Sequence, residues 1–282
     1  MTTAVELKNV SFKYATAKEN TIRNASFKIK EGEFCALIGA NGSGKTTICN
    51  LIRGFAPHFY TGDIEGELEI FGEKITEESL KMLSKEVGFV FQNPFVQISG
   101  STETVFAEVA FGLENLGTPL DVINKRVNET LKLTGIDHLR DKNPTELSGG
   151  QKQRVALASI LAMEPKIFVI DEPTSQLDPQ GTEDIFEIIK LLKSQGKTII
   201  LVEHKIELVA EYADHIIVLD KGEVVMDGTS QEIFTDSKLL THCVQLPCYA
   251  NVGLMLQRNG IEVPMIPIRK SEAVNCFRKE SL

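Results

Sequence analysis

The sequence predicts an α/β fold in which a mixed, mainly parallel sheet is joined to an antiparallel β-lobe, a helical subdomain and a small C-terminal accessory domain. Three observations lead to this prediction. Apolar and polar positions alternate over residues 5–12 and 23–29, which is typical of half-buried strands in an antiparallel lobe. Mainly apolar runs at 33–38, 166–170 and 198–202 are typical of strands buried in a parallel sheet. Helical patterns between these runs supply the connections that parallel strands need.

The helices are predicted from apolar residues spaced three or four apart. The set that follows a glycine-rich loop is Ile48, Leu51, Ile52 and Phe55. The set that predicts a crossover helix between the last two buried runs is Ile185, Ile188, Ile189 and Leu192. A mainly helical pattern from about residue 93 to 163 predicts the helical subdomain.

A β-hairpin is predicted near the end of the sheet. Two short apolar runs, 216–219 and 224–226, flank the turn-forming sequence Asp-Lys-Gly-Glu. Thr229 and Glu232 have the spacing of a capping box for the next helix. The first domain is therefore expected to end near residue 235.

We accordingly predict a domain at 1–235 and a C-terminal accessory domain at 236–282. The accessory domain contains Pro247, Pro264 and Pro267, which punctuate it. Within it, one helix is predicted near 249–259 and another that Ser271 caps.

Bulk properties exclude several classes of protein. With 42% hydrophobic and 24% charged residues the chain is ordinary for a globular protein, and no stretch reaches the roughly 18 to 20 apolar residues of a membrane span. The N-terminal residues do not resemble a signal peptide, so we expect the cytosol. A net charge of −9 and a pI near 5.2 argue against nonspecific binding to nucleic acid or anionic lipid. The five cysteines lack metal-site spacing and are interpreted as reduced, mostly buried thiols.

The strongest motif lies between a predicted strand and a predicted helix and fits GxxxxGK[ST], the phosphate-binding loop of P-loop NTPases. Its glycines let backbone N–H groups wrap a phosphate chain, Lys45 reaches the β- and γ-phosphates, and Thr46 ligates Mg²⁺. The alternative is a glycine-rich turn with an incidental lysine. The predicted nucleotide-binding residues here are Gly39, Asn41, Gly42, Ser43, Gly44, Lys45, Thr46 and Thr47.

Two carboxylates end a buried strand at Asp171 and Glu172. Such an arrangement is costly unless the charges meet a cation, and Mg²⁺ would supply it. Asp171 is then predicted to complete the surroundings of the metal. Glu172 is predicted to accept a proton from the attacking water. Taken alone, such a pair more often caps a helix; together with the phosphate loop it indicates catalysis.

A second anion-binding segment follows about a hundred residues after the first, in Leu147-Ser-Gly-Gly-Gln151. Ser148 can cap a helix, and Gly149 and Gly150 let the helix N-terminus approach an anion. A single chain rarely uses two such ends on one nucleotide. This segment is where the sequence resembles the ATP-binding-cassette family.

The resemblance covers about residues 4–235 and implies an ATPase that binds ATP and Mg²⁺. In that family two subunits lie head to tail, and each nucleotide lies between one subunit's 39–46 loop and the other's 147–151 segment. The resemblance thus assigns Ser148, Gly149, Gly150 and Gln151 to the partner's nucleotide.

Four further matches follow the family's order. Tyr14 is expected to stack on adenine, with Phe12 as a competing candidate. Gln92 is expected to sense the metal and the water, and His204, which follows Glu203, to contact the γ-phosphate. Asp178 belongs to the interfacial segment 175–178, where Gln176 replaces the more usual alanine.

Two stretches are similar to the ATPases of energy-coupling-factor importers, which carry vitamins, their precursors or metal ions. These are Gln92–Gln97 with Phe106–Gly117, and the tail at 245–282. The resemblance implies a second ATPase subunit, a transmembrane scaffold subunit, a separate substrate-binding membrane subunit, and a place on the cytoplasmic side of the membrane. The dimer could contain two copies of this chain or one copy and a relative.

Two alternatives remain. The chain could power another importer or an exporter, against which the tail weighs. It could instead be a soluble cassette that acts on nucleic acid or the ribosome. That class is expected to carry long coiled-coil insertions or two cassettes, and we find neither, so no nucleic-acid partner is predicted.

Overall fold

The computed structural model describes residues 2–175 and 177–277. A six-stranded sheet crosses the molecule in the order β10-β9-β3-β8-β7-β6, and all neighbours are parallel except β9 and β10. Its strands are β3 (Phe34–Ile38), β6 (Val87–Val90), β7 (Ile167–Asp171), β8 (Thr198–Val202), β9 (His215–Asp220) and β10 (Glu223–Thr229). This mixed sheet confirms the predicted α/β class.

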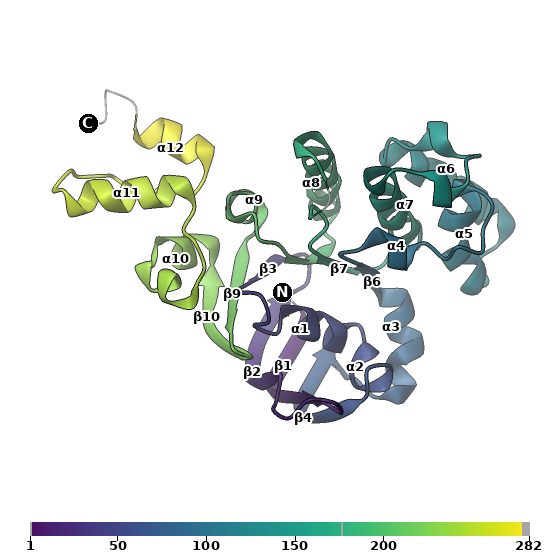
Figure 1. Cartoon of the computed structure of the whole chain (residues 1–282), viewed down its shortest axis with the longest axis horizontal. Helices are drawn as coiled ribbons and strands as arrows, with labels where there is room; N and C mark the ends of the chain where they lie inside the picture. Colours follow the sequence, from purple (N-terminus) through teal and green to yellow (C-terminus); the bar gives the residue numbers. More distant parts are fainter. Residues whose placement is uncertain (1, 176, 278–282) are drawn as a thin grey trace.

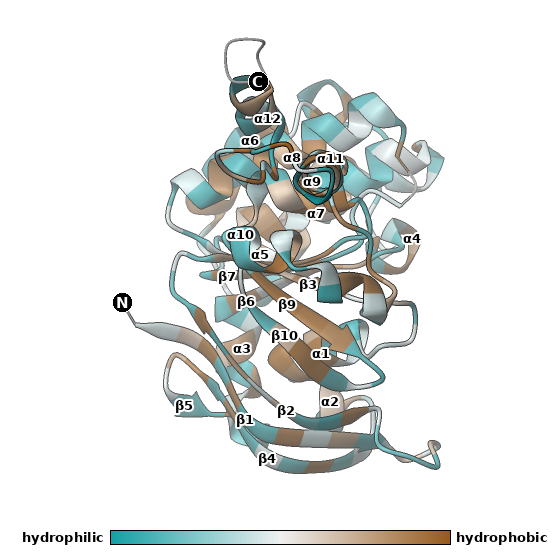
Figure 2. Cartoon of the chain, turned by 90° about the vertical axis from the view of Figure 1, so that its left-hand side faces the viewer, coloured by the Kyte–Doolittle hydropathy of each residue, from teal (hydrophilic) through white to brown (hydrophobic). Residues whose placement is uncertain are grey.

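A second, antiparallel sheet forms the predicted β-lobe, in the order β2-β1-β4-β5. Its strands are β1 (Thr3–Tyr14), β2 (Ile22–Lys30), β4 (Gly62–Ile70) and β5 (Glu73–Lys74). The lobe lies below the main sheet in Figure 1, and helix α1 (Lys45–Ile52) lies between the two sheets. Figure 2 shows the brown, apolar strands β3 and β9 above the alternating colours of β1 and β2, as the sequence patterns predict.

Helices cover both faces of the main sheet, those that precede β6 on the side of the β-lobe and those that follow β7 on the other face. Short helices follow α1 and precede β6: α2 (Phe55–His58), η1 (Glu77–Ser79) and α3 (Leu80–Glu86). The crossover helix is α8 (Pro179–Ser194), and α9 (Ile206–Tyr212) follows β8. The helix predicted from Ile48 to Phe55 is too long, because a left-handed Gly54 separates α1 from α2.

The helical subdomain forms a separate lobe on the right of Figure 1. Its helices are α4 (Pro94–Gln97), α5 (Val105–Asn115), α6 (Leu120–Leu133), η2 (Asp137–Leu139), η3 (Pro144–Glu146) and α7 (Gly149–Ala162). It has its own hydrophobic cluster, to which α5, α6 and α7 contribute. Four residues, 163–166, separate the end of helix α7 from the strand that carries Asp171, so the subdomain is joined directly to the site.

The C-terminal part packs on the far side of the main sheet. Its helices are α10 (Ser230–Thr235), η4 (Ser237–His242), α11 (Cys248–Arg258) and α12 (Lys270–Cys276). The capping box of Thr229 and Glu232 is confirmed. The predicted cap at Ser271 is wrong, since Arg269 precedes α12 and the side chain of Glu272 accepts from its N–H. The boundary at 235 stays a prediction, because Leu239 and Leu246 share the cluster that covers the sheet.

The hydrophobic core has two layers, one on each face of the main sheet. Alternate residues of each central strand point to opposite faces, so Phe34 lies in one cluster and Cys35 in the other. The prediction of mostly buried cysteines is wrong, because only Cys35 and Cys49 are buried and Cys243 and Cys248 are exposed. In the described part of the chain, no helix has the length and apolar character that would let it cross a bilayer.

Candidate active site

The carboxyl ends of β3, β7 and β8 meet at one edge of the sheet and carry the predicted site. The loop from Gly39 to Gly44 leaves β3 and ends where α1 begins at Lys45. Gly39 has φ 148°, and a Cβ atom there would lie 2.1 Å from the Leu219 carbonyl oxygen. Gly44 has φ 108° and contacts Ile22. Only glycine fits these two positions, so the loop can lie close to β9 and β2.

A cavity of about 330 Å³ opens over this loop. The residues that line it are Thr21, Asn41, Gly42, Gly44, Lys45, Thr46, Thr47, Gln92 and Glu172. The structure therefore brings together most of the predicted phosphate-loop residues with three residues from elsewhere in the chain, Thr21, Gln92 and Glu172. Ser43 is buried beneath, and its hydroxyl oxygen has no hydrogen-bond partner among the described residues.

Lys45 is the buried cation of this cavity. Its side chain is 5% exposed, and its ammonium donates hydrogen bonds of 2.9 Å to the carbonyl oxygens of Gly39 and Ala40. Burial lowers the pKa of Lys45, while the nearby carboxylates of Glu172 and Asp171 oppose the change. The ammonium thus lies within a loop whose N–H groups and dipole already favour an anion.

Asp171 is the last residue of β7 and lies buried behind the loop. Burial raises the pKa of its carboxyl above the ordinary 3.8, and a hydrogen bond with Thr46 opposes this effect. Its Oδ1 atom has no hydrogen-bond partner among the described residues. A buried carboxylate oxygen without a partner is costly, so the pair Thr46 and Asp171 forms a site suited to a cation.

Glu172 lies at the centre of a hydrogen-bonded set that three loops supply. Its backbone has φ 46°, and its N–H donates to the Val202 carbonyl oxygen over 2.9 Å. Its Oε2 accepts from the Gln92 amide at 2.6 Å, and its Oε1 lies 2.9 Å from His204 Nε2. The sequence separates Gln92, Glu172 and His204 widely, and the fold brings them into contact.

Tyr14, at the end of β1, is half-buried beside the loop. Its hydroxyl donates to the Thr47 hydroxyl over 3.1 Å, and its ring meets that of Phe12 edge to face at a centroid distance of 4.8 Å. Phe12 is fully buried and contacts Gly62. Phe12 therefore has no surface to offer a base, which leaves Tyr14 as the aromatic residue of the pair that a ligand could reach.

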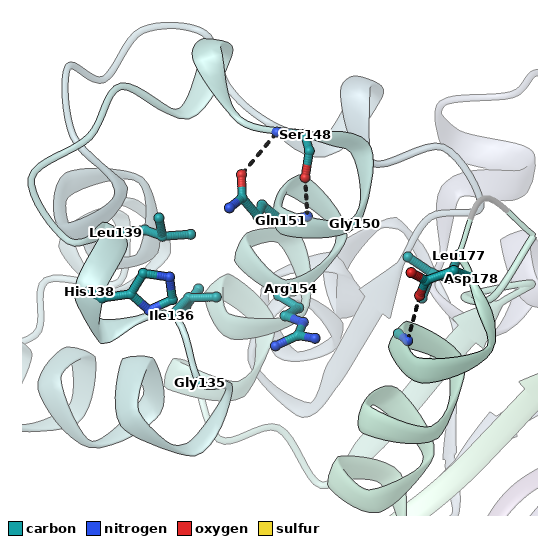
Figure 3. A pocket seen from close by; sticks show the side chains of 11 residues that line it. Gly135, Ile136, His138, Leu139, Ser148, Gly150, Gln151, Arg154, Leu177 and Asp178 are labelled. Atoms are coloured by element: carbon teal, nitrogen blue, oxygen red, sulfur yellow. Dashed lines mark hydrogen bonds between the residues drawn. The ribbon is translucent and has the colours of Figure 1, made fainter.

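The segment from Ser148 to Gln151 lies elsewhere and forms a second site. Ser148 caps α7, and the Gln151 side chain accepts from the Ser148 N–H at 3.0 Å, which completes a capping box. These residues line a cavity of about 440 Å³ that Asp178 and Arg154 also line, as Figure 3 shows. Asp178 caps α8 by accepting from the Gly181 N–H at 2.7 Å. Gln176 lies outside the described residues.

The two cavities share no lining residue. The structure therefore brings together Lys45, Thr46, Gln92, Asp171, Glu172 and His204, but not the segment 148–151 or Asp178. The first cavity lies at the N-terminus of α1, and the second lies at the N-termini of α7 and α8.

Sequence reasoning missed the residues that support the site from behind. Glu203 is 4% exposed and accepts hydrogen bonds from Thr174, His204 and Lys205. Arg154, which lines the second cavity, pairs with Asp184 of α8. The signal for Glu203 was a charged residue at the end of a buried strand. Its hydrogen-bond partners could not be predicted, because they depend on the pairing of β7 with β8.

Comparison with known proteins agrees with this geometry. Residues 22–175 match the ABC transporter family. An ABC transporter ATP-binding protein of Pyrococcus horikoshii is 43% identical over 97% of this chain and 96% of its own length. The energy-coupling factor transporter ATP-binding protein EcfA1 of Ligilactobacillus salivarius is 38% identical over 96% of this chain and 94% of its own.

One solved structure extends the likeness to three dimensions. The cbiO1 protein of Clostridium perfringens, described as part of the ABC transporter complex cbiONQ, superposes with a TM-score of 0.75. It is 32% identical and covers 92% of this chain and 98% of its own. The phosphate loop, the separate serine-capped helix and these matches together identify the chain as a member of the ABC transporter family, an ATP-binding subunit that hydrolyses ATP to drive transport.

Proposed function

We propose that this chain powers an energy-coupling-factor importer for a vitamin, a vitamin precursor or a metal ion, from the cytoplasmic side of the membrane. The observation that carries the catalytic part is the position of Glu172, which is held between Gln92 and His204 beside the phosphate loop. The names of two relatives, an energy-coupling factor ATPase and a component of a cbiONQ complex, support the importer type.

The hydrolytic roles follow from the chemistry of the side chains. The loop 39–47 cradles the phosphates, and Lys45 releases its two carbonyl contacts to bind them. Glu172 accepts the proton of the attacking water, because its carboxylate opens on the same cavity as Lys45. Gln92 and His204 hold that carboxylate and meet the water and the γ-phosphate when the nucleotide is bound. Tyr14 stacks on the adenine.

A bound Mg²⁺ fits the residues present. Thr46 would ligate the ion, and Gln92 lines the same cavity. Asp171 would complete the surroundings of the ion, because its Oδ1 is buried without a hydrogen-bond partner in the described structure. The ion would neutralise charge on the phosphates. The fit rests on oxygen donors, which Mg²⁺ prefers.

The second cavity supports a dimer. Ser148, Gly149, Gly150 and Gln151 present a capped helix N-terminus that the chain's own phosphate loop does not meet. A head-to-tail partner would place this helix end against the nucleotide bound by the other subunit, with Asp178 at the contact. ATP would then hold the dimer together.

An apolar groove supports a membrane partner. A cavity of about 510 Å³ runs between α2, α3, β6 and the end of α7, with Phe55, Leu83, Phe89 and Met163 among its lining residues. Phe59 at its rim is 72% exposed, which is unusual for a large aromatic side chain without a partner. We assign a helix of the transmembrane scaffold subunit to this groove, because β6 leads from it directly to Gln92.

The test is a mild-detergent pull-down of the tagged chain from its native membranes, with partners identified by mass spectrometry and ATPase activity measured on the same sample. The wild type should capture a scaffold protein and a small substrate-binding membrane protein. Phe59→Asp should lose the scaffold, whereas Leu120→Asp, which is 71% exposed but lies on α6 away from the groove, should keep it. Capture of only soluble factors or nucleic acid would contradict the transport proposal and leave the ATPase assignment intact.

A further inference from the structure

We propose that Glu203 is a positioning residue that joins two catalytic loops and sets the contact between His204 and Glu172. This inference rests on the proposed hydrolytic roles of those two residues. It concerns a residue that touches neither the phosphate loop nor its cavity.

The two loops follow neighbouring strands. Strands β7 and β8 are parallel, with Asp171 opposite Val202, so the residues that follow them leave the sheet side by side. One loop continues from Glu172 to Thr174 and the other from Glu203 to Lys205. The Glu172 N–H donates to the Val202 carbonyl oxygen where the strands end. Beyond that bond, a side chain is needed to hold the two loops in place relative to each other.

The Glu203 carboxylate supplies that connection. Its Oε1 accepts from the backbone N–H groups of His204 at 2.9 Å and Lys205 at 3.2 Å. Its Oε2 accepts from the Thr174 hydroxyl at 2.8 Å. One side chain therefore fixes the backbone that carries His204 relative to the backbone two residues after Glu172.

The environment of Glu203 argues that these bonds are the reason for its presence. The side chain is 4% exposed, and within the described chain no side-chain nitrogen of a Lys, Arg or His lies within ion-pair distance of its carboxylate. A buried carboxylate without a cation is retained only where hydrogen bonds satisfy it. Three donors do so here, and two of them belong to the loop of His204.

The consequence for hydrolysis is geometric. His204 Nε2 lies 2.9 Å from Glu172 Oε1. Apart from the backbone bond between Glu172 and Val202, the hydrogen bonds of Glu203 are those that join the backbone of the His204 loop to the loop of Glu172 in the described structure. If the loop of His204 shifts by about 1 Å, the set of Gln92, Glu172 and His204 loses its alignment, which can slow a reaction about 100-fold. Glu203 acts through His204 and does not meet the reacting atoms.

Three variants of the full-length chain test this role in a steady-state ATPase assay. Glu203→Ala removes all three acceptors and should lower kcat by about 10- to 100-fold, with a change in KM for ATP below about threefold. Glu203→Gln keeps an oxygen for the two N–H groups, and the Thr174 hydroxyl can turn to accept from its amide, so it should recover most of the activity. Thr174→Val keeps the volume and removes only one bond, so its loss should be smaller.

A matched control separates positioning from general stability. Glu108 is also 4% exposed and also accepts three hydrogen bonds, from Ser99 and Thr102, but lies in the helical subdomain. Glu108→Ala should lower the melting temperature as Glu203→Ala does, with kcat per folded molecule unchanged. If both variants lose kcat only in proportion to their folded fraction, the positioning role is wrong.

A double-mutant cycle gives the sharpest outcome. If Glu203 acts through His204, Glu203→Ala should cause little further loss in a chain that already carries His204→Ala. Fully multiplicative losses would overturn the proposal. Should Glu203→Ala not fold, Thr174→Val in the same cycle gives the same distinction. Loss of transporter capture in the pull-down leaves these results unaffected, because they use the purified ATPase alone.

Discussion

At the scale of single residues, the site depends on a glutamate held in an uncommon backbone conformation. Glu172 adopts φ 46°, in the left-handed region that costs a non-glycine residue of order 1–3 kcal/mol. Its N–H bond to Val202 and its side-chain contacts with Gln92 and His204 offset this cost. The conformation turns the residue out of the direction of β7, and its side chain lines the phosphate-loop cavity.

Replacing Glu172 by glutamine should separate ATP binding from hydrolysis. The amide fills the same space but cannot take a proton, so we expect kcat to fall by about 100-fold or more, with ATP affinity retained. Lys45→Ala should instead weaken ATP binding, because the buried ammonium of the loop is lost. Nucleotide titration and single-turnover hydrolysis measure both quantities, and Glu223→Gln, on β10, serves as the control. Unchanged turnover in Glu172→Gln would show that another group activates the water.

At the scale of elements, sequence patterns predict the strands that are buried on both faces. Strands β3, β7 and β8 are continuous apolar runs, and they carry the loops of Lys45, Glu172 and His204. Strand β4 was missed because it is glycine- and glutamate-rich and largely exposed, and because Gly66 interrupts the alternation of apolar and charged residues in its sequence. Strand β6 was missed because it is only four residues long and contains Gly88.

The same limit applies to the candidate site. Motifs predict which residues take part, because each motif is local in sequence. Contacts between loops, such as Glu203 with Thr174, depend on strand pairing over 29 residues of sequence separation and leave no local pattern. Helix ends are also poorly predicted. By residue type Ser271 is the better cap for α12, but the helix begins after Arg269, whose N–H donates to the side chain of Glu272.

Gln97 on α4 connects elements that belong to the two halves of the nucleotide site. Its Oε1 accepts from the Phe91 N–H at 3.0 Å, next to Gln92, and its Nε2 donates to the Ala156 carbonyl oxygen of α7 at 3.0 Å. Helix α7 begins at the cap Ser148. A change at Gln92 is thus linked to the segment that we propose meets the partner's nucleotide.

Gln97→Leu should therefore weaken the link with little change in volume. We expect a loss of about 1–3 kcal/mol in the free energy of unfolding, because the Phe91 N–H loses its acceptor, and a lower kcat with ATP affinity retained. Denaturant unfolding and ATPase assays measure the two effects. Gln180→Leu, which removes an exposed bond to Asp184 on α8, should change neither. Equal behaviour of the two variants would contradict a special role for Gln97.

At the scale of the whole molecule, the described core consists of three hydrophobic clusters, two on the faces of the main sheet and one in the helical subdomain. Helix α7 joins the subdomain to the sheet, because Leu157 lies in a cluster of the sheet and Val155 in that of the subdomain. The edge formed by β9 and β10 is the least enclosed part of this arrangement, because β10 is mostly half-buried or exposed. His215 is placed at this edge and connects three segments.

His215 should make the stability of the molecule depend on pH. Burial alone would lower the pKa of His215, but its hydrogen bond to Asp227 of β10 and the nearby Glu33, 3.3 Å from Nδ1, outweigh burial and raise the pKa above 6.5. Since the folded-state pKa exceeds the unfolded value, the stabilisation is complete below about pH 6.5 and is lost as the pH rises through the raised value. Denaturant unfolding should therefore show a larger deficit for His215→Gln at pH 6 than at pH 9. His58→Gln, for which the described structure gives no carboxylate partner, is the control, and a deficit for His215→Gln that does not change with pH would contradict the charged pairing.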